Sequence, residues 1–276
     1  MTIKLLTLNT HSLIEENAEL KRHSFARTVA DVLPDVIALQ EVNQSADAPL
    51  VPPEQLEEYL PCHPSVTLRS NNHALAVARE LKALGVTYHW SYLPIKRGYG
   101  IYDEGVALLF RNPAQEFDIL TISRRDDFES WKTRKILGAK IGDIWFYSTH
   151  LGWWDDCEEP FAAQWRRLNA HMRKRNRVFL MGDFNSPSDL RGESYDLVLS
   201  DGWIDTHTVA GQKSGRVTIP GAVAGWTERA ISNGGARVDY IFCNFPCASL
   251  FSRVIFDGSD TPIVSDHFGL ICQIEM

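Results

Sequence analysis

Short hydrophobic runs recur along the chain, each bounded by polar or turn-forming residues. Runs of this length are typical of buried β-strands. They predict strands at Ile3–Leu8, Val36–Gln40, Val106–Phe110, Ile136–Ile141, Trp145–His150, Val178–Gly182, Val238–Cys243, Leu250–Phe256 and Gly269–Ile274.

Between some of these strands, apolar residues recur at helical spacing. The spacing predicts helices at Leu20–Leu33, which Pro34 would end, at Asn72–Leu84, with Gly85 as a stop, and at Phe161–Met172. Helix–strand units mixed with many antiparallel-looking strands favour two sheets packed face to face with helices outside, an α/β sandwich.

Composition narrows the class of protein. The chain has 276 residues, of which 44% are hydrophobic, so it can bury a large core, and we expect residues 1–276 to form one domain. No run approaches the ~20 apolar residues of a membrane span. The N-terminal residues MTIKLLTLNTHS lack the pattern of a signal peptide, so a cytoplasmic location is expected.

Net charge and cysteine content narrow the possible functions only slightly. The net charge of −7 and the lack of basic arms make a nucleic-acid partner less favoured without excluding it. The dense basic stretches, Arg166-Arg167 and Arg173–Arg177, fall in an expected helix and fit a solvated face. Five scattered cysteines match no zinc pattern and are expected to be free thiols.

Acids, amides and histidines gather at the ends of the predicted strands. Taken singly, an Asp there is usually a turn former and a lone His usually a core or surface residue. As a set they suit a hard cation such as Mg²⁺ or Mn²⁺ beside a phosphoryl group, and no GxSxG motif or P-loop suggests another chemistry. The set is Asn9, Gln40, Glu41, Asp103, Glu104, His150, Asp183, Asn185, Asp239, Asp266 and His267.

The segment VFLMGDFNSP (Val178–Pro187) is compatible with two local structures, a continued strand and a turn. Residues i and i+2 of an extended chain share a face, so Asp183 and Asn185 would point at one spot if the strand continued. A turn stabilised by the Asp side chain, leading into Ser186-Pro187, accounts for the same residues, and the two arrangements are compatible.

The motifs LNTH, ALQEVN, STHLGWW, GDFNSP, RVDYIF and VSDHFG, in this order and across nearly the whole chain, resemble the endonuclease/exonuclease/phosphatase superfamily. Its members include DNase I, abasic-site endonucleases, neutral sphingomyelinases and inositol-polyphosphate 5-phosphatases. The resemblance implies a four-layered α/β sandwich, DNase I-like, and a divalent-metal-dependent phosphoesterase.

Roles for individual residues follow from the resemblance. It implies that Glu41, assisted by Asn9, binds the metal, with Asp266 as a further ligand or a neighbour through water. It places Asp183 to activate the attacking water and Asn185 to hold the phosphate or that water.

The same resemblance implies that His267 is paired with Asp239, and His150 with Glu104, so that both imidazoles are oriented and more basic. The match of Arg134 to a phosphate-contacting arginine is looser, and an arginine on a surface strand explains it equally well. Which residue is the general base stays open.

Aromatic residues between the motifs bear on the substrate. Trp153-Trp154 follows His150, and Trp226 precedes the Asp239 strand; adjacent tryptophans in a strand cannot both face inward. Such rings could stack on a sugar, on a nucleobase, or belong to the core. More narrowly, HLGWWDD with the LLTLNTHS opening and YDEGVALL resembles the bacterial maltose 6'-phosphate phosphatase group, which implies a small phosphorylated sugar as substrate. The alternative is a nuclease or other phosphodiesterase of the same chemistry.

Overall fold

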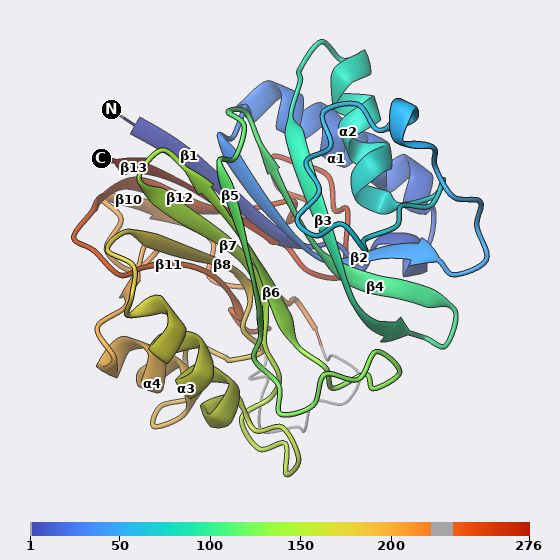
Figure 1. Ribbon diagram of the computed structural model, residues 1–276. Helices are drawn as coiled ribbons and strands as arrows, with labels where there is room; N and C mark the ends of the chain where they lie inside the picture. Colours follow the sequence, from blue (N-terminus) through green and yellow to red (C-terminus); the bar gives the residue numbers. More distant parts are fainter. Residues whose placement is uncertain (1, 222–233) are drawn as a thin grey trace.

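Two mixed β-sheets form the centre of the protein (Figure 1). The computed structural model describes residues 2–221 and 234–276. One sheet has seven strands in the order β10-β12-β13-β1-β2-β4-β3, and the other has six in the order β5-β6-β7-β8-β11-β9. The strands are β1 Thr2–Asn9, β2 Val36–Ser45, β3 His89–Gly98, β4 Tyr102–Phe110, β5 Glu116–Thr121, β6 Lys135–Ile141, β7 Ile144–His150, β8 Val178–Asp183, β9 Ile204–Asp205, β10 Gln212–Ser214, β11 Asp239–Cys243, β12 Ala248–Ile255 and β13 Gly269–Glu275.

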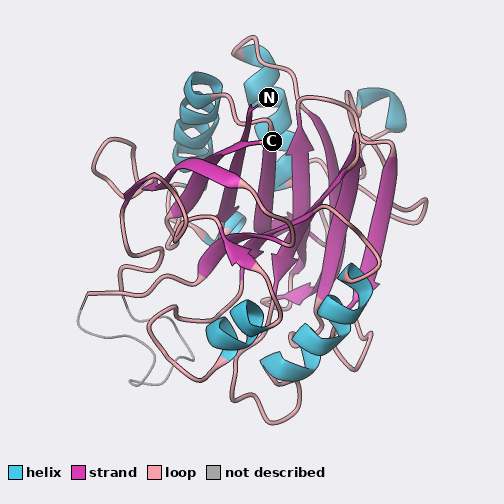
Figure 2. Cartoon of the chain, turned by 90° about the vertical axis from the view of Figure 1, so that its left-hand side faces the viewer, coloured by secondary structure: helices cyan, strands magenta, loops and turns pink. Residues whose placement is uncertain are grey.

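Helices cover the outer face of each sheet, so the sheets lie between two helical layers (Figure 2). The α-helices are α1 Ala18–Val32, α2 His73–Ala83, α3 Phe161–Met172 and α4 Ser194–Ser200, and the 3-10 helices are η1 Ser12–Ile14 and η2 Pro53–Gln55. One core cluster joins α1 and α2 to the seven-stranded sheet, and another joins α3 and α4 to the six-stranded sheet. The predicted four-layered α/β sandwich is confirmed.

The alternation of side chains along each strand builds these layers. In β8, Val178 and Leu180 pack under α3, whereas Phe179 and Met181 pack between the two sheets. This period of two is the geometry of an extended chain, and both faces are apolar because both are covered. The strand therefore reads as a continuous hydrophobic run in the sequence.

Each strand and helix expected from the sequence is present, with ends shifted by up to five residues. The pattern missed β3, β5, β9, β10 and α4. Strand β3 carries Pro94 and the charged pair Lys96-Arg97, and Pro in a strand pattern argues against a strand. In the structure Pro94 lies where the β3–β4 register shifts, a position that tolerates it.

Strand direction brings the polar strand ends together. Strands β1 and β2 are parallel, as are β7 and β8, so within each pair the carboxyl ends lie at one edge. Asn9 pairs with Gln40 in the first sheet, and Asp183 lies between His150 and Asp239 in the second. The sheets face each other, and both edges contribute to one pocket.

Two further expectations from the sequence concern membrane-spanning helices and the cysteines. None of the helices there is long and apolar enough to cross a membrane. All five cysteines are free, as expected, although the sulfurs of Cys243 and Cys247 are 3.1 Å apart at the end of β11.

Candidate active site

A wide pocket opens where the two sheet edges meet. It holds about 1740 Å³ of open space, counting the solvent at its mouth. We call its titratable lining side chains that are less than one-tenth exposed the floor: Lys96, Glu104, Arg134, His150, Asp183 and His267. We call the aromatic side chains at its mouth the rim: Tyr99, Trp131 and Trp153. The floor is charged and the rim is apolar, so the pocket offers two different environments.

A β-bulge directs Glu41 into this pocket. The pairing of β2 with β4 shifts register between Leu39 and Val42, and Glu41 has a φ of 50°. A bulge with a positive φ turns a side chain out of the strand's alternation. Desolvation and the negative charge of Glu104 raise the pKa of Glu41, so a cation bound beside it would stabilise its carboxylate.

Gly182 allows Asp183 to reach the pocket from the end of β8. Its φ is 150°, and a Cβ at this position would lie 1.9 Å from the carbonyl oxygen of Thr149, so only glycine fits. After Asp183 the extended geometry stops: Asn185 has a φ of 48°, and its backbone N–H donates to Asp183 Oδ1 at 2.7 Å. The strand does not continue to Asn185; the side-chain turn forms instead, and both residues still line the pocket.

Asn9 connects the two sheets across the floor. Its Nδ2 donates to Glu41 Oε1 at 2.9 Å and to Asp183 Oδ2 at 3.1 Å. The segment around His267 joins this network because the Ser265 hydroxyl donates to the carbonyl oxygen of Asn9 at 2.8 Å. Residues from four distant parts of the sequence are therefore held together by hydrogen bonds.

The pairing of His267 with Asp239 is present. His267 Nδ1 lies 2.9 Å from Asp239 Oδ2, and both side chains are buried. Burial alone would lower the pKa of His267, but the charge of Asp239 and this hydrogen bond raise it to about 10. His267 Nε2 lies 3.9 Å from Asp183 Oδ2, so a cationic imidazole faces the carboxylate.

The expected pairing of His150 with Glu104 is wrong. His150 Nε2 instead lies 3.6 Å from Asp183 Oδ2, while Glu104 Oε1 lies 3.0 Å from Lys96 Nζ. Burial lowers the pKa of His150 well below its ordinary value, and the positive charges of Arg134 and Lys96 lower it further. His150 is therefore a neutral imidazole at neutral pH rather than the more basic group expected from the sequence.

Lys96 was not predicted as a site residue from the sequence, and its pairing with Glu104 explains why. Lys96 and Glu104 are opposite each other in the β3–β4 pairing, so their contact depends on a strand that the pattern did not predict. Gly98 leaves room for the Glu104 carboxylate, since a Cβ there would lie 2.6 Å from Glu104 Oε2. Recognising β3 would have indicated the ion pair.

Oxygen ligands for a divalent cation are present among the residues that line the pocket. Glu41 and Asp266 line it, and Asn9 lies behind Glu41. Asp266 is at the mouth, with its side chain 49% exposed. Carboxylate and amide oxygens without thiolates fit Mg²⁺ or Mn²⁺, and the desolvated Glu41 has no positively charged group within ion-pair distance in the described residues. Within the described residues, ligand atoms lie within 4.8 Å of one another in two groups: His11, Glu15 and Asp266, and Asp183, Asp239 and His267.

The tandem tryptophans are separated by the structure. Trp153 lines the pocket, and its Nε1 donates to Asn185 Oδ1 at 3.0 Å. Trp154 packs instead against Phe161 and the core beneath α3, so the structure does not bring it to the pocket as the sequence led us to expect. The chain between β7 and α3 is irregular, and strand alternation does not apply there. Trp226 lies outside the described residues.

Two further aromatic side chains complete the rim: Trp131, which was not identified from the sequence, and Tyr99, one of several aromatic residues that precede Glu104. Trp131 is 50% exposed, and its ring centroid lies 5.7 Å from that of Trp153. Tyr99 is 63% exposed, and its hydroxyl lies 3.2 Å from His11 Nε2. Of the aromatics preceding Glu104, Tyr88, Trp90 and Tyr92 are buried in the core. Trp131 stands alone in a charged loop, so no periodic pattern marks it.

The fold and the pocket define the class. Two packed mixed sheets under outer helices, with acids, an amide and histidines at their joined strand ends, are the architecture of a DNase I-like phosphoesterase. A model of the endonuclease/exonuclease/phosphatase family matches residues 6–267. The chain belongs to this family, whose members are hydrolases acting on phosphoesters and are generally dependent on divalent metals.

Solved structures agree with this assignment. An endonuclease/exonuclease/phosphatase family protein from Leptotrichia buccalis is similar at a TM-score of 0.86 and 29% identity, covering 99% of this chain and 100% of that one. A mannosyl-6-phosphatase from Bacteroides thetaiotaomicron has a TM-score of 0.63 and 18% identity, with coverage of 99% and 100%. A 3' phosphatase from Neisseria, bound to a product DNA hairpin, has the same values. A search of curated protein sequences returned no match.

Proposed function

We propose that this protein is a divalent-metal-dependent phosphatase that hydrolyses a sugar phosphate monoester, such as maltose 6'-phosphate. The observation that carries the proposal is the composition of the pocket. A floor of buried carboxylates, histidines and cations lies under a rim of tryptophan and tyrosine. The floor suits a phosphoryl group and its attacking water, and the rim suits the face of a sugar ring.

Asp183 is our candidate for the base. Burial raises its pKa to about 7, against the opposing charge of His267, and a carboxylate of this basicity can accept a proton from water near neutral pH. In the proposed reaction a bond forms between the water oxygen and phosphorus as the bond from phosphorus to the sugar oxygen breaks. Asp183 takes the water proton, and the sugar oxygen leaves as an alcohol after taking up a proton from solvent water.

The other floor residues would orient and neutralise the phosphate. Cationic His267, held by Asp239, and the guanidinium of Arg134 would face phosphate oxygens. Asn185 is held by Trp153 and by its own Nδ2, which donates to the Leu151 carbonyl oxygen at 2.8 Å. Glu41, Asn9 and Asp266 would hold Mg²⁺, or Mn²⁺, which when bound supplies positive charge against the phosphate.

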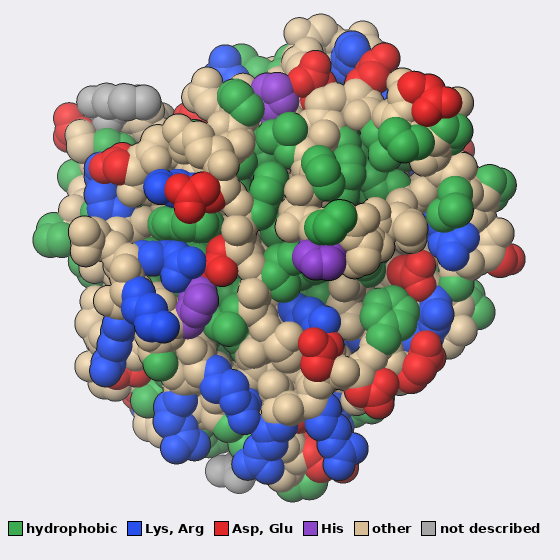
Figure 3. Space-filling view, in the orientation of Figure 1, with side chains coloured by type: hydrophobic (Ala, Val, Ile, Leu, Met, Phe, Trp, Pro, Cys, Tyr) green, Lys and Arg blue, Asp and Glu red, His purple; other side chains and the backbone are tan. Residues whose placement is uncertain are grey.

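The position of the basic side chains on α3 supports a small substrate rather than a nucleic acid. Basic side chains gather in the lower part of the face in Figure 3, where α3 lies in Figure 1. Those of α3 and its C-terminal turn, Arg166, Arg167, Arg173, Lys174, Arg175 and Arg177, are not among the residues that line the pocket. A nuclease needs basic side chains that follow the substrate backbone into the site. Similar structures include a mannosyl-6-phosphatase and a 3' phosphatase bound to DNA, so both substrate classes need testing.

A phosphate-release screen tests the proposal. The purified protein would be assayed with Mg²⁺, and separately with EDTA, on sugar phosphates including maltose 6'-phosphate, on nucleotides, and on plasmid and hairpin DNA. We expect release from a sugar phosphate that EDTA abolishes, and intact DNA. Cleavage of DNA at comparable enzyme concentrations, with sugar phosphates untouched, would replace the proposal with the nuclease alternative.

A further inference from the structure

Two buried cations from different sheets share one hydrogen-bond acceptor in the pocket. Lys96 lies in β3, and Arg134 immediately precedes β6. Lys96 Nζ donates to the carbonyl oxygen of Trp131 at 3.1 Å, and Arg134 Nη1 donates to the same oxygen at 3.5 Å. Lys96 is 8% exposed and Arg134 is 6% exposed, and both line the pocket. The Trp131 carbonyl therefore holds two positive groups side by side under the rim.

Only one member of this pair has a direct ion-pair partner in the described part of the chain. Lys96 is paired with Glu104, but Arg134 has no carboxylate oxygen within 4.0 Å in the described part of the chain. Its Nε, also buried, has no hydrogen-bond partner there. Buried charges are normally paired, and a buried guanidinium with free N–H groups facing a pocket is a site for an anion.

The donors left free match the oxygens of a phosphate monoester. Arg134 can offer a planar pair of N–H groups to two terminal oxygens. Lys96 has three N–H groups, and Glu104 and the Trp131 carbonyl accept two of them, so one remains. A monoester has three terminal oxygens and about two negative charges at neutral pH. In a diester one of those oxygens carries a second organic group.

We propose that Lys96 is a specificity-determining residue that, beside Arg134, binds the third terminal oxygen of a phosphate monoester and makes the pocket prefer monoesters to diesters. The inference rests on the proposed function only in placing the phosphoryl group in this pocket. A diester would set its second ester group against the Lys96 ammonium and leave that charge without an anion.

The test is the ratio of kcat/KM for p-nitrophenyl phosphate to that for bis(p-nitrophenyl) phosphate, measured with Mg²⁺ on the full chain. In Lys96→Met we expect this ratio to fall about 100-fold, with most of the loss on the monoester. Lys96→Arg, which keeps the charge, should lose less. A ratio unchanged within about threefold in folded Lys96→Met would overturn the proposal.

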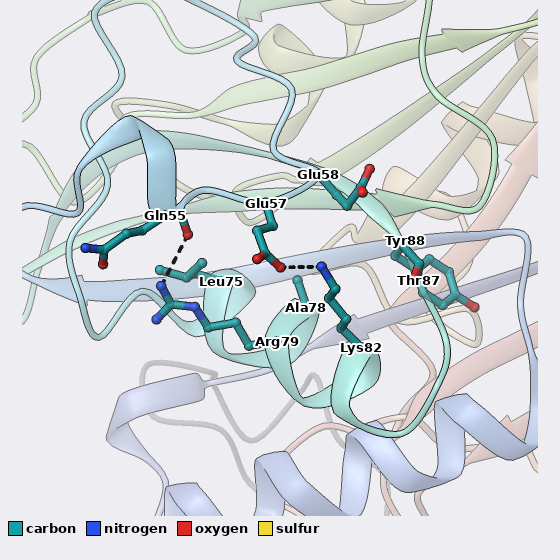
Figure 4. Close-up of a pocket in the computed structure, with 9 residues that line it drawn as sticks. All are labelled: Gln55, Glu57, Glu58, Leu75, Ala78, Arg79, Lys82, Thr87 and Tyr88. Atoms are coloured by element: carbon teal, nitrogen blue, oxygen red, sulfur yellow. Dashed lines mark hydrogen bonds and ion pairs between the residues drawn. The ribbon is translucent and has the colours of Figure 1, made fainter.

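The matched control is Lys82→Met. Lys82 also forms an ion pair with a glutamate, Glu57, but in a shallow pocket over α2 that shares no lining residue with the active-site pocket (Figure 4). Its substitution should leave both rates unchanged. A change in the ratio as large as that of Lys96→Met would show that the effect is not local, and would also overturn the proposal.

Loss of folding is handled by two further measurements. The double variant Lys96→Met/Glu104→Gln removes both charges of the pair, so no buried carboxylate is left alone, and its ratio should fall as in Lys96→Met. In the wild type, inorganic phosphate should inhibit far more strongly than dimethyl phosphate, and equal inhibition would count against the proposal. If sugar phosphates are not substrates but the ratio still falls in Lys96→Met, the sugar proposal fails while the role of Lys96 stands.

Discussion

The floor and the rim of the pocket are built in different ways. Two floor residues, His150 and Asp183, lie at the ends of strands that are paired on both sides, and the backbone N–H of Asn185 donates a hydrogen bond that holds Asp183. Rim residues lie on turns and loops: Tyr99 is in the turn between β3 and β4, and Trp131 and Trp153 lie outside regular elements. A rigid floor fits chemistry that needs fixed geometry, whereas loop-borne aromatics fit the choice of substrate.

One hydrogen bond joins the two regions. Trp153 Nε1 donates to Asn185 Oδ1, so a ring of the rim helps to fix an amide beside Asp183. We therefore expect floor substitutions to lower the rate of the chemical step and rim substitutions to raise KM. Substitution of Trp153 should affect both.

Removing the candidate base should have the largest effect. Asp183→Ala, and separately His267→Ala, should lower kcat by about 10⁴-fold because each removes a group that acts on the water or the phosphate. Phosphate release from p-nitrophenyl phosphate measures this. Asp189→Asn, at an exposed position just beyond the site, is the control and should be active. Near-normal rates in either alanine variant would mean that the site is misassigned.

Substitution of Asp239, the partner of His267, should lower kcat less than substitution of His267 itself. Asp239→Asn keeps the shape but removes the charge that raises the pKa of His267, and we expect kcat to fall about 10- to 100-fold. The same assay reports it, with circular dichroism to confirm folding. An effect equal to that of Asp183→Ala would indicate that Asp239 contacts the reacting groups directly.

A rim substitution should discriminate between substrates. Trp153→Ala should raise KM about tenfold for a sugar phosphate and much less for p-nitrophenyl phosphate, because only the sugar loses a stacking surface. Trp153→Phe keeps a ring and removes the hydrogen bond to Asn185, so it separates stacking from positioning. Equal changes in KM for both substrates would remove the sugar-stacking argument.

Trp154 should behave as a core residue, which gives the smallest effect on activity. Trp154→Ala should lower the free energy of unfolding by about 2 kcal/mol, since its ring packs against Phe161, and should leave KM for a sugar phosphate nearly unchanged. Chemical denaturation and steady-state kinetics check the two parts. A large rise in KM without loss of stability would indicate that Trp154 contacts the substrate.

The polar residues at the strand ends could be predicted from the sequence much further than the rim. Asn9, Glu41, His150 and Asp183 follow apolar runs, and parallel pairing brings such strand ends to one edge whatever the loops do. Which floor side chains contact each other was harder to predict. The contact of Glu104 with Lys96 depends on the register of a strand interrupted by Pro94.

The rim depends on loop conformation, which local sequence does not specify. Trp153 and Trp154 are chemically identical neighbours, yet one lines the pocket and the other packs in the core. Trp131 lies far from both in sequence and meets Trp153 only because two loops fold against each other. Aromatic residues in loops can be listed from a sequence, but their direction comes from tertiary packing.

The central claim is that residues from both sheets bind one cation and one phosphoryl group in the same pocket. Relaxation of the ³¹P nucleus of inorganic phosphate, measured with protein loaded with Mn²⁺ and then with Mg²⁺, tests it most directly. We predict strong paramagnetic broadening with Mn²⁺ in the wild type, none with Mg²⁺, and a large loss of the Mn²⁺ effect in Glu41→Gln. Phosphate that binds to the wild type without any broadening by Mn²⁺ would contradict the claim.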